Sequence, residues 1–159
     1  MKLYDERINF ISEKIGVGKS FDAVKRDIKI GSKKASLFFI DGFIKDDVMI
    51  WIIQRLQELS REDIVPDTLT KLIRDKIAYL ECDSSEDLEE ILYSLLSGCA
   101  VLFVEDLKEA IIIDVRTYPA RGPEEPDLEK VTRGSRDGFV EIIVFNTALI
   151  RRRIRDPNL

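Results

Sequence analysis

The chain has 159 residues, of which 45% are hydrophobic and 35% are charged, and its formal net charge is −5. This length and hydrophobic content suit one globular domain or two small ones. The acidic balance argues against a general nucleic-acid-binding protein, because neutralising phosphates requires a basic surface. The absence of histidine excludes histidine-based catalytic triads and histidine-ligated zinc sites.

The cysteines and the apolar runs indicate a reduced, soluble chain without a cofactor. Cys82 and Cys99 are too few to build a zinc site alone. The N-terminus is charged where a secretory signal would be apolar, so we expect both thiols to be free. No run approaches the ~18–20 apolar residues of a membrane span. We expect neither a metal nor another cofactor.

The first third of the chain predicts a helix and a hairpin. Apolar residues at roughly helical spacing predict a helix over residues 2–15, which Gly16 ends. It is expected either to pack on the body or to extend as an arm. Residues 22–30 then end in strand-like alternation, and Gly31 begins a turn. Residues 35–40 form an apolar run typical of a strand buried on both faces.

The middle of the chain predicts two more helices. Asp46 and Asp47 favour a helix start, and one apolar face runs from Met49 to Leu59. Trp51 is expected in the core or an interface rather than in a ligand site. Asp67 is placed to cap a short helix from Thr68 to about Arg74.

Residues 77–116 predict further strands around one helix. Residues 77–80 are expected to be a short strand or an extended linker. Ser84 and Asp87 resemble a capping box that opens a helix over Glu86–Leu96. Apolar runs at 99–104 and 110–116 predict two strands.

The two halves of the chain have similar patterns of predicted strands and flanking helices. This similarity predicts an α/β (α+β) protein of two small α/β subdomains, each with a short mixed sheet flanked by helices. The expected division is 1–66 and 67–159, with the second part containing a loop at 118–138 and a terminal helix at 139–154.

Three groups of residues suggest chemistry, and each also has a structural explanation. Glu105, Asp106 and Asp114 are candidate acid/base or cation-binding carboxylates, but acidic residues are also common in turns. Residues 16–20 (GVGKS) weakly resemble a phosphate loop without its spacing. The arginines at 151–153 and 155 either favour a helix C-terminus or form a basic patch beside anionic lipids.

The loop at 118–138 is rich in proline, glycine and opposite charges. Prolines stiffen it, and its arginines can pair with its carboxylates. Asp137 is placed to cap the following helix. Such a long polar loop is either a self-paired surface segment or a docking element.

The residues of this loop and the following helix resemble the signature of the GerA family, the A subunits of bacterial spore germinant receptors. The pattern consists of Pro119, Arg121, Glu125-Pro126, Glu129, Arg133-Gly134, Arg136-Asp137-Gly138-Phe139, Glu141, Asn146 and Leu149-Ile150-Arg151-Arg152-Arg153-Ile154. Ile142 departs from the polar residue expected in many relatives. Upstream segments are also similar to the family, so the resemblance spans nearly the whole chain.

The resemblance implies a non-enzymatic signalling or ligand-sensing domain that takes part in nutrient-triggered germination. It implies a soluble N-terminal domain that ends just before a first membrane span, on the cytoplasmic (spore core) side of the spore inner membrane. The implied partners are the receptor's B and C subunits and other A subunits. The germinant would be an amino acid, sugar or nucleoside. The expected ligand or coupling residues are Arg121, Glu125, Glu129, Arg133, Asp137, Asn146 and Arg151.

Two alternatives remain open at this stage. A nutrient-binding module would hold its ligand in a cleft between the subdomains, as inter-domain clefts often do. A carboxylate-dependent hydrolase would instead require Glu105, Asp106 and Asp114 to gather in one pocket.

Overall fold

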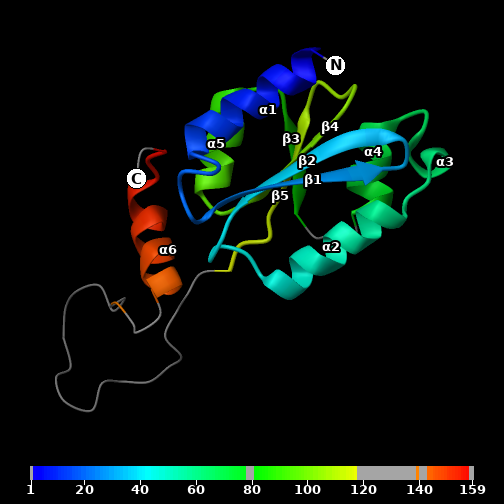
Figure 1. Ribbon diagram of the computed structural model, residues 1–159. Coiled ribbons are helices and arrows are strands. Elements are labelled where there is room, and N and C mark those ends of the chain that lie inside the picture. Colours follow the sequence, from blue (N-terminus) through cyan, green and yellow to red (C-terminus); the bar gives the residue numbers. More distant parts are fainter. Residues whose placement is uncertain (1, 78–80, 118–138, 140–142, 158–159) are drawn as a thin grey trace.

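A computed structural model describes residues 2–77, 81–117, 139 and 143–157. Figure 1 shows a central sheet with helices on both faces. The strands are β1 (Ala23–Ile30), β2 (Lys33–Ile40), β3 (Cys82–Ser85), β4 (Ala100–Val104) and β5 (Ala110–Ile113). The helices are α1 (Lys2–Ile15), α2 (Asp46–Glu58), α3 (Arg61–Ile64), α4 (Thr68–Lys71), which continues into the π-helix η1 (Leu72–Lys76), α5 (Leu88–Leu96) and α6 (Ile143–Ile154).

The described strands form one five-stranded sheet in the order β1-β2-β4-β5-β3, and neighbouring strands are antiparallel. Strand β2 pairs with its hairpin partner β1 and also with the distant β4, with Leu37 opposite Leu102. The α/β class is confirmed, but the expectation of two short mixed sheets is wrong. The apolar runs of β2 and β4 pair with each other, so the proposed division at residue 66 does not separate two sheets.

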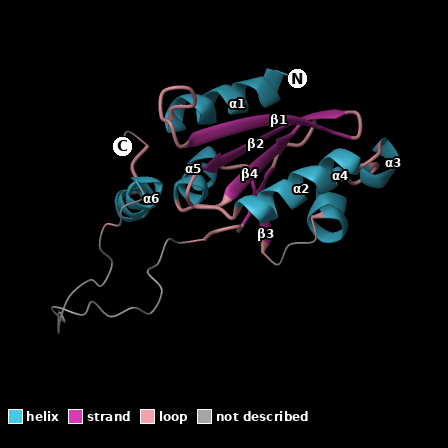
Figure 2. Cartoon of the chain, turned by 60° about the horizontal axis from the view of Figure 1, so that its bottom comes forward, coloured by secondary structure: helices cyan, strands magenta, loops and turns pink. Residues whose placement is uncertain are grey.

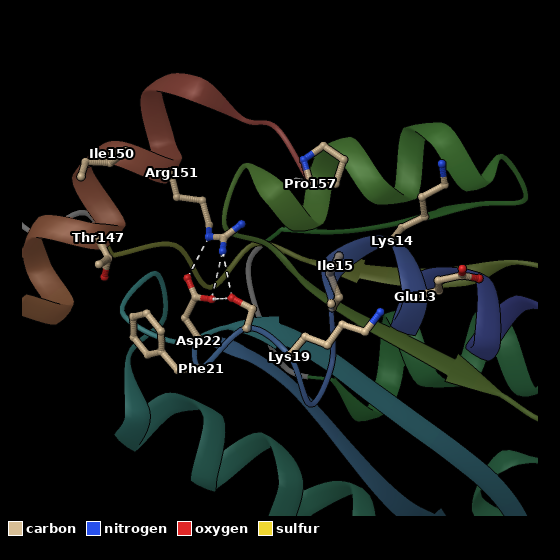
Figure 3. Close-up of a pocket in the computed structure, with 12 residues that line it drawn as sticks. Glu13, Lys14, Ile15, Lys19, Phe21, Asp22, Thr147, Ile150, Arg151 and Pro157 are labelled. Atoms are coloured by element: carbon tan, nitrogen blue, oxygen red, sulfur yellow. Dashed lines mark hydrogen bonds and ion pairs between the residues drawn. The ribbon is translucent and has the colours of Figure 1, made fainter. Parts of the chain in front are cut away.

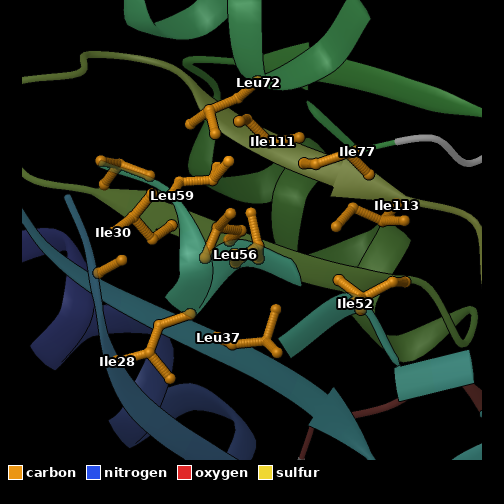
Figure 4. Close-up of a cluster of buried hydrophobic side chains, with 14 of the residues drawn as sticks. Ile28, Ile30, Leu37, Ile52, Leu56, Leu59, Leu72, Ile77, Ile111 and Ile113 are labelled. Carbon is orange, nitrogen blue, oxygen red and sulfur yellow. The ribbon is translucent and has the colours of Figure 1, made fainter. Parts of the chain in front are cut away.

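Strand β4 explains why both faces of the sheet carry a core. Ala100, Leu102 and Val104 belong to one apolar cluster, and Val101 and Phe103 belong to the other. A strand buried on both faces therefore appears in the sequence as a continuous apolar run. Figure 4 shows part of the first cluster.

The helices divide between the two faces of the sheet. The first cluster includes buried residues of α2, α3 and η1, and the second includes residues of α1, α5 and α6. Figure 2 shows α2 and α1 on opposite sides of the strands. Helix α1 is thus a packed element rather than a free arm, with Ile8, Ile11 and Ile15 buried.

Several predicted elements are confirmed with small changes in their bounds. The turn at Gly31, the helix from Asp46 and the Asp67 cap are present; the Asp67 carboxylate accepts from the Thr70 amide at 3.2 Å. The last predicted strand ends at Ile113. Residues 78–80 and 118–138 lie outside the described residues, so the predicted segments there are not tested.

One local prediction is wrong, and one alternative of another is excluded. Ser84 does not cap a helix, because it lies in β3 and its hydroxyl donates to Glu109. Asp87 caps α5 instead, accepting from the Glu89 amide at 2.9 Å. Trp51 is 45% exposed on α2 and therefore does not belong to the core, and its expected alternative place in an interface is not tested.

Candidate functional site at the docking of α6

Helix α6 meets the loop between α1 and β1 across an open groove of about 690 Å³. One wall comes from the end of α1 and the loop, including Lys14, Lys19 and Phe21. The other wall comes from α6, through Thr147, Ile150 and Arg151. Figure 3 shows these side chains around the groove. The groove therefore joins segments from the two ends of the chain.

A buried ion pair connects the two walls. Arg151 donates from Nε to Asp22 Oδ2 at 2.8 Å and from Nη2 to Asp22 Oδ1 at 3.0 Å. The two side chains are 5% and 4% exposed. Arg151 Nη2 also donates to Ser20 Oγ at 3.2 Å, and the Ser20 hydroxyl donates to Asp22. Arginine's planar fork suits this two-pronged geometry, so the pair fixes both the position and the rotation of α6.

The loop holds Asp22 in place through its own backbone. Gly16 ends α1 with a φ of +73°, a conformation that glycine adopts without steric cost. The amides of Lys19 and Ser20 donate to Gly16 O at 2.8 Å, and the Val17 amide donates to Ser12 O at 2.9 Å. These amides are engaged within the loop and are not arranged to bind a phosphate. The loop is a support for Ser20 and Asp22.

The rest of α6 has few apolar anchors among its described side chains. Ala148 and Leu149 are its buried apolar residues, whereas Ile143 and Ile154 are exposed. Beyond the helix end, the Arg155 guanidinium lies 5.4 Å from the centre of the Tyr93 ring on α5 and donates to the Tyr93 hydroxyl. Directional polar contacts therefore hold α6 in one orientation on the body.

The structure places two of the seven predicted coupling residues. Arg151 is in the buried ion pair, and Asn146 is partly buried on the same helix. The other five, Arg121, Glu125, Glu129, Arg133 and Asp137, lie outside the described residues. Arg151 is an internal contact and does not belong to an exposed basic patch. Sequence reasoning missed Asp22 and Ser20, since no local pattern links them to a residue so distant in the chain.

A second groove, of about 700 Å³, lies between α1 and the β1–β2 hairpin. Tyr4 and Ser36 share a hydrogen bond of 2.8 Å between their hydroxyl oxygens, and Ser36 donates to Asp27 Oδ1 at 2.5 Å. Lys25 lies 3.1 Å from the Asp27 carboxylate. Burial acts to raise the pKa of Asp27, but the Ser36 hydrogen bond and Lys25 together lower it. Burial raises the pKa of Tyr4. This groove is polar and carries both charges.

The three candidate catalytic carboxylates do not form one cluster. Asp106 pairs with Lys33 at 2.8 Å, and Glu105 accepts from the Lys34 amide at 3.3 Å. Asp114 accepts from Arg116 Nε at 2.7 Å, at the opposite end of the β4–β5 pair. These hydrogen bonds to cations lower the pKa of Asp106 and of Asp114. The shared pocket expected for a hydrolase is absent.

Within the described parts of the chain, no group of acidic or cysteine side chains is arranged to hold a metal ion. In the same residues, no helix has the length and hydropathy needed to cross a bilayer.

Comparison with known proteins identifies the family. The model of the Bacillus/Clostridium GerA spore germination protein family matches residues 9–159. The chain belongs to the GerA family. Among its GerA-family relatives, the Stage V sporulation protein AF of Bacillus subtilis is 39% identical over 94% of this chain and 30% of that protein. The spore germination protein GerLA of Bacillus cereus is 30% identical over 90% of this chain and 30% of that protein.

A solved structure confirms the fold within the GerA family. It is the N-terminal domain of the A subunit of the Bacillus megaterium spore germinant receptor GerK3, with a TM-score of 0.69 and 25% identity. The match covers 96% of this chain and 55% of that one. This chain spans about 30% of the length of the curated relatives above. The relatives are spore germination and sporulation proteins, and this supports a role in germination.

Proposed function

We propose that this chain is the coupling domain of a GerA-family germination protein. In this proposal it transmits a nutrient-dependent change between its body and the remainder of a longer subunit, without enzymatic chemistry. The observation that carries the proposal is the buried Asp22–Arg151 ion pair, which docks the last helix onto the body. The solved neighbour is an N-terminal domain, so the remaining chain would follow α6.

The proposed setting is the spore inner membrane, with this domain on the cytoplasmic side. The proposed partners are the receptor's B and C subunits and other A subunits. The solved neighbour supports this assignment, since it comes from the A subunit of a spore germinant receptor. The charged side chains of segment 118–138 would contact these partners, with Arg121, Glu125, Glu129, Arg133 and Asp137 as coupling residues and Asn146 supporting them from α6.

Mutations that exchange the charges of residues 22 and 151 test the coupling proposal. Asp22→Arg and Arg151→Asp each break the ion pair, and the double variant restores opposite charges. We expect each single variant to slow germination in a mixture of amino acids, sugars and nucleosides, and the double variant to recover part of the rate. Arg151→Lys keeps the charge without the two-pronged geometry, and we expect an intermediate rate.

Protein levels and a surface control make the result interpretable. Asp106→Asn breaks the exposed Lys33–Asp106 pair and should leave germination unchanged. Wild-type germination by both single variants, at wild-type protein levels in spores, would refute coupling through this ion pair. Arg133→Ala and Glu125→Ala test the loop residues in the same assay.

A nutrient-binding role is the second proposal, and the polar groove beside Tyr4 favours it. Cationic Lys25, anionic Asp27 and the two hydroxyls are suited to a zwitterion or a polyol. Titration of the labelled chain with amino acids, sugars and nucleosides should then shift resonances of Tyr4 and Ser36 saturably. The absence of saturable shifts with every nutrient would reject a site in this domain.

A role during sporulation is a further candidate, favoured by the 39% identity to the Stage V sporulation protein AF. Deletion of the gene separates the two roles. A coupling domain for germination predicts normal numbers of heat-resistant spores that germinate slowly. A sporulation role predicts fewer heat-resistant spores.

A further inference from the structure

The two elements joined by the ion pair both expose apolar side chains beside the same groove. Phe21, on the α1–β1 loop, is 68% exposed, and Ile143 and Ile154 at the two ends of α6 are 69% and 53% exposed. Phe21 lines the groove opposite Thr147 and Ile150 of α6 (Figure 3). Packing among the described residues does not explain a largely exposed phenylalanine next to a buried ion pair.

The exposed isoleucines share one side of α6 with the groove residues. Ile143, Thr147, Ile150 and Ile154 follow the spacing i, i+4, i+7, i+11, which places them in one line along a helix. Helix α6 thus departs from an ordinary surface helix, since the charged Arg151 is buried beside Ala148 and Leu149 while Ile143 and Ile154 are exposed. Such an arrangement marks a surface that contacts something outside the chain.

The charge around this apolar surface is opposite to that of the chain as a whole. Lys14 and Lys19 are exposed on the loop side of the groove, and Arg153 is exposed at the end of α6. Apart from Arg151, whose charge is paired with Asp22, residues 143–159 contain three arginines and one aspartate, a net charge of +2, whereas the whole chain has −5. An anionic surface would attract this region and repel the acidic body, and this would orient the domain.

We infer that this surface, formed by Lys19, Phe21, Ile143, Arg153 and Ile154, lies against an anionic lipid bilayer. Exposed apolar side chains flanked by lysine and arginine are the pattern of interfacial membrane contact. The relatives are much longer than the part that matches this chain, and the solved neighbour is the N-terminal domain of its subunit. One relative, 37% identical over 43% of this chain, is the uncharacterised membrane protein YfkQ of Bacillus subtilis. A membrane close to the end of α6 is the occupant that these observations favour.

Vesicle flotation of the 159-residue chain tests this inference. We expect binding to vesicles of roughly one-third phosphatidylglycerol in phosphatidylcholine and at least about tenfold weaker binding to pure phosphatidylcholine. Binding to the anionic vesicles should weaken as salt rises, because salt screens exposed charges. The paired variants Phe21→Ser/Ile154→Ser and Lys19→Gln/Arg153→Gln should each reduce the partition coefficient by about fivefold or more.

Matched controls lie on other exposed surfaces. Ile50→Ser/Trp51→Ser removes an exposed apolar pair from α2, and Arg55→Gln/Arg74→Gln removes two exposed arginines. Each control should change binding by less than about twofold, with melting curves confirming that every variant folds. Equal binding to anionic and to pure phosphatidylcholine vesicles would refute the proposed contact with an anionic bilayer. Control variants that lose as much vesicle binding as the paired variants would refute it as well.

Sedimentation velocity distinguishes a protein occupant. Self-association that the Phe21 and Ile154 changes abolish, without vesicle binding, would replace the bilayer by a second copy of the chain. A lipid-facing surface is a property beyond the coupling proposal, and the two fail separately. A chain that does not bind vesicles would refute the lipid surface, but it would not change the germination rates expected for the Asp22–Arg151 charge-exchange variants.

Discussion

The sheet and α6 are held in the molecule by different kinds of interaction, apolar burial in the sheet and directional polar contacts at α6. Every residue of β4 is buried, and apolar clusters cover both faces of this strand. In α6, the buried side chains among those described are Ala148, Leu149 and Arg151. Apolar burial is non-directional and scales with area, so the sheet is stabilised by many interchangeable contacts. The ion pair of α6 is directional, and it fixes one register while adding little net stability.

A core truncation gives the largest expected effect. Leu102→Ala removes a fully buried side chain of β4 next to Leu37. We expect it to lower the free energy of unfolding by about 2–5 kcal/mol, through lost burial and a residual cavity. Guanidinium denaturation measures this loss. Ile50→Ala, at an exposed position on α2, is the control and should change stability by about 0.5 kcal/mol or less.

Breaking the ion pair should have a smaller and more local effect. Removing one partner of a buried pair costs about 3–5 kcal/mol if the other charge stays buried. In Asp22→Asn, α6 can detach and hydrate Arg151, so the cost cannot exceed the free energy of docking. Hydrogen exchange should accelerate in α6 by about tenfold or more and remain unchanged in β4. Equal acceleration in β4 would show that α6 belongs to the cooperative core.

The Asp63 carboxylate gives a pH-dependent effect within the body. Its hydrogen bonds with Lys76 (2.9 Å), the Ser60 hydroxyl (2.7 Å) and the Ser60 amide (2.9 Å) lower the pKa of Asp63. A carboxyl whose pKa is lower in the folded state stabilises the fold above its unfolded pKa of about 4. This contribution is lost as the pH falls below about 4. The melting temperature of Asp63→Asn should therefore lie below that of the wild type at about pH 7, and this difference should shrink in acid.

The two free thiols give the smallest effect, a difference in reaction rate without a change in fold. Cys99 is buried, and desolvation raises its pKa to about 11. Burial also raises the pKa of Cys82, which is less buried. The thiolate is the reactive form, so a thiol reagent at about pH 8 should modify Cys82 first. Faster modification of Cys99 would indicate that the β4 end of the sheet opens locally.

The sequence predicted the elements whose signal is local. The continuous apolar runs of β2 and β4 and the Gly31 turn predicted strands that the structure contains. Strand β3 was missed because Cys82–Ser85 is polar and takes its strand conformation from pairing with β5. The pairing of β2 with β4 joins strands that are far apart in the sequence, and no local pattern encodes it. The similarity between the two halves therefore wrongly suggested two separate sheets.

The candidate site was harder to predict than the fold. Arg151 was selected within the family pattern, but its partner Asp22 lies near the other end of the chain. A carboxylate at residue 22 resembles any other acidic residue before a strand, and its burial depends on α6 returning to it. The side chains that remain exposed around the ion pair, such as Phe21, follow from the same tertiary arrangement.

The pairing of β2 with β4 has a consequence for synthesis on the ribosome. The β1–β2 hairpin and α2 emerge early, but the second neighbour of β2 comes only after Val104 has been made. Until then, Leu37 and Phe38 lie on a strand with an open edge, which invites pairing with other chains. A nascent chain that ends near residue 66 would therefore depend on the ribosome or a chaperone to keep that edge from aggregating.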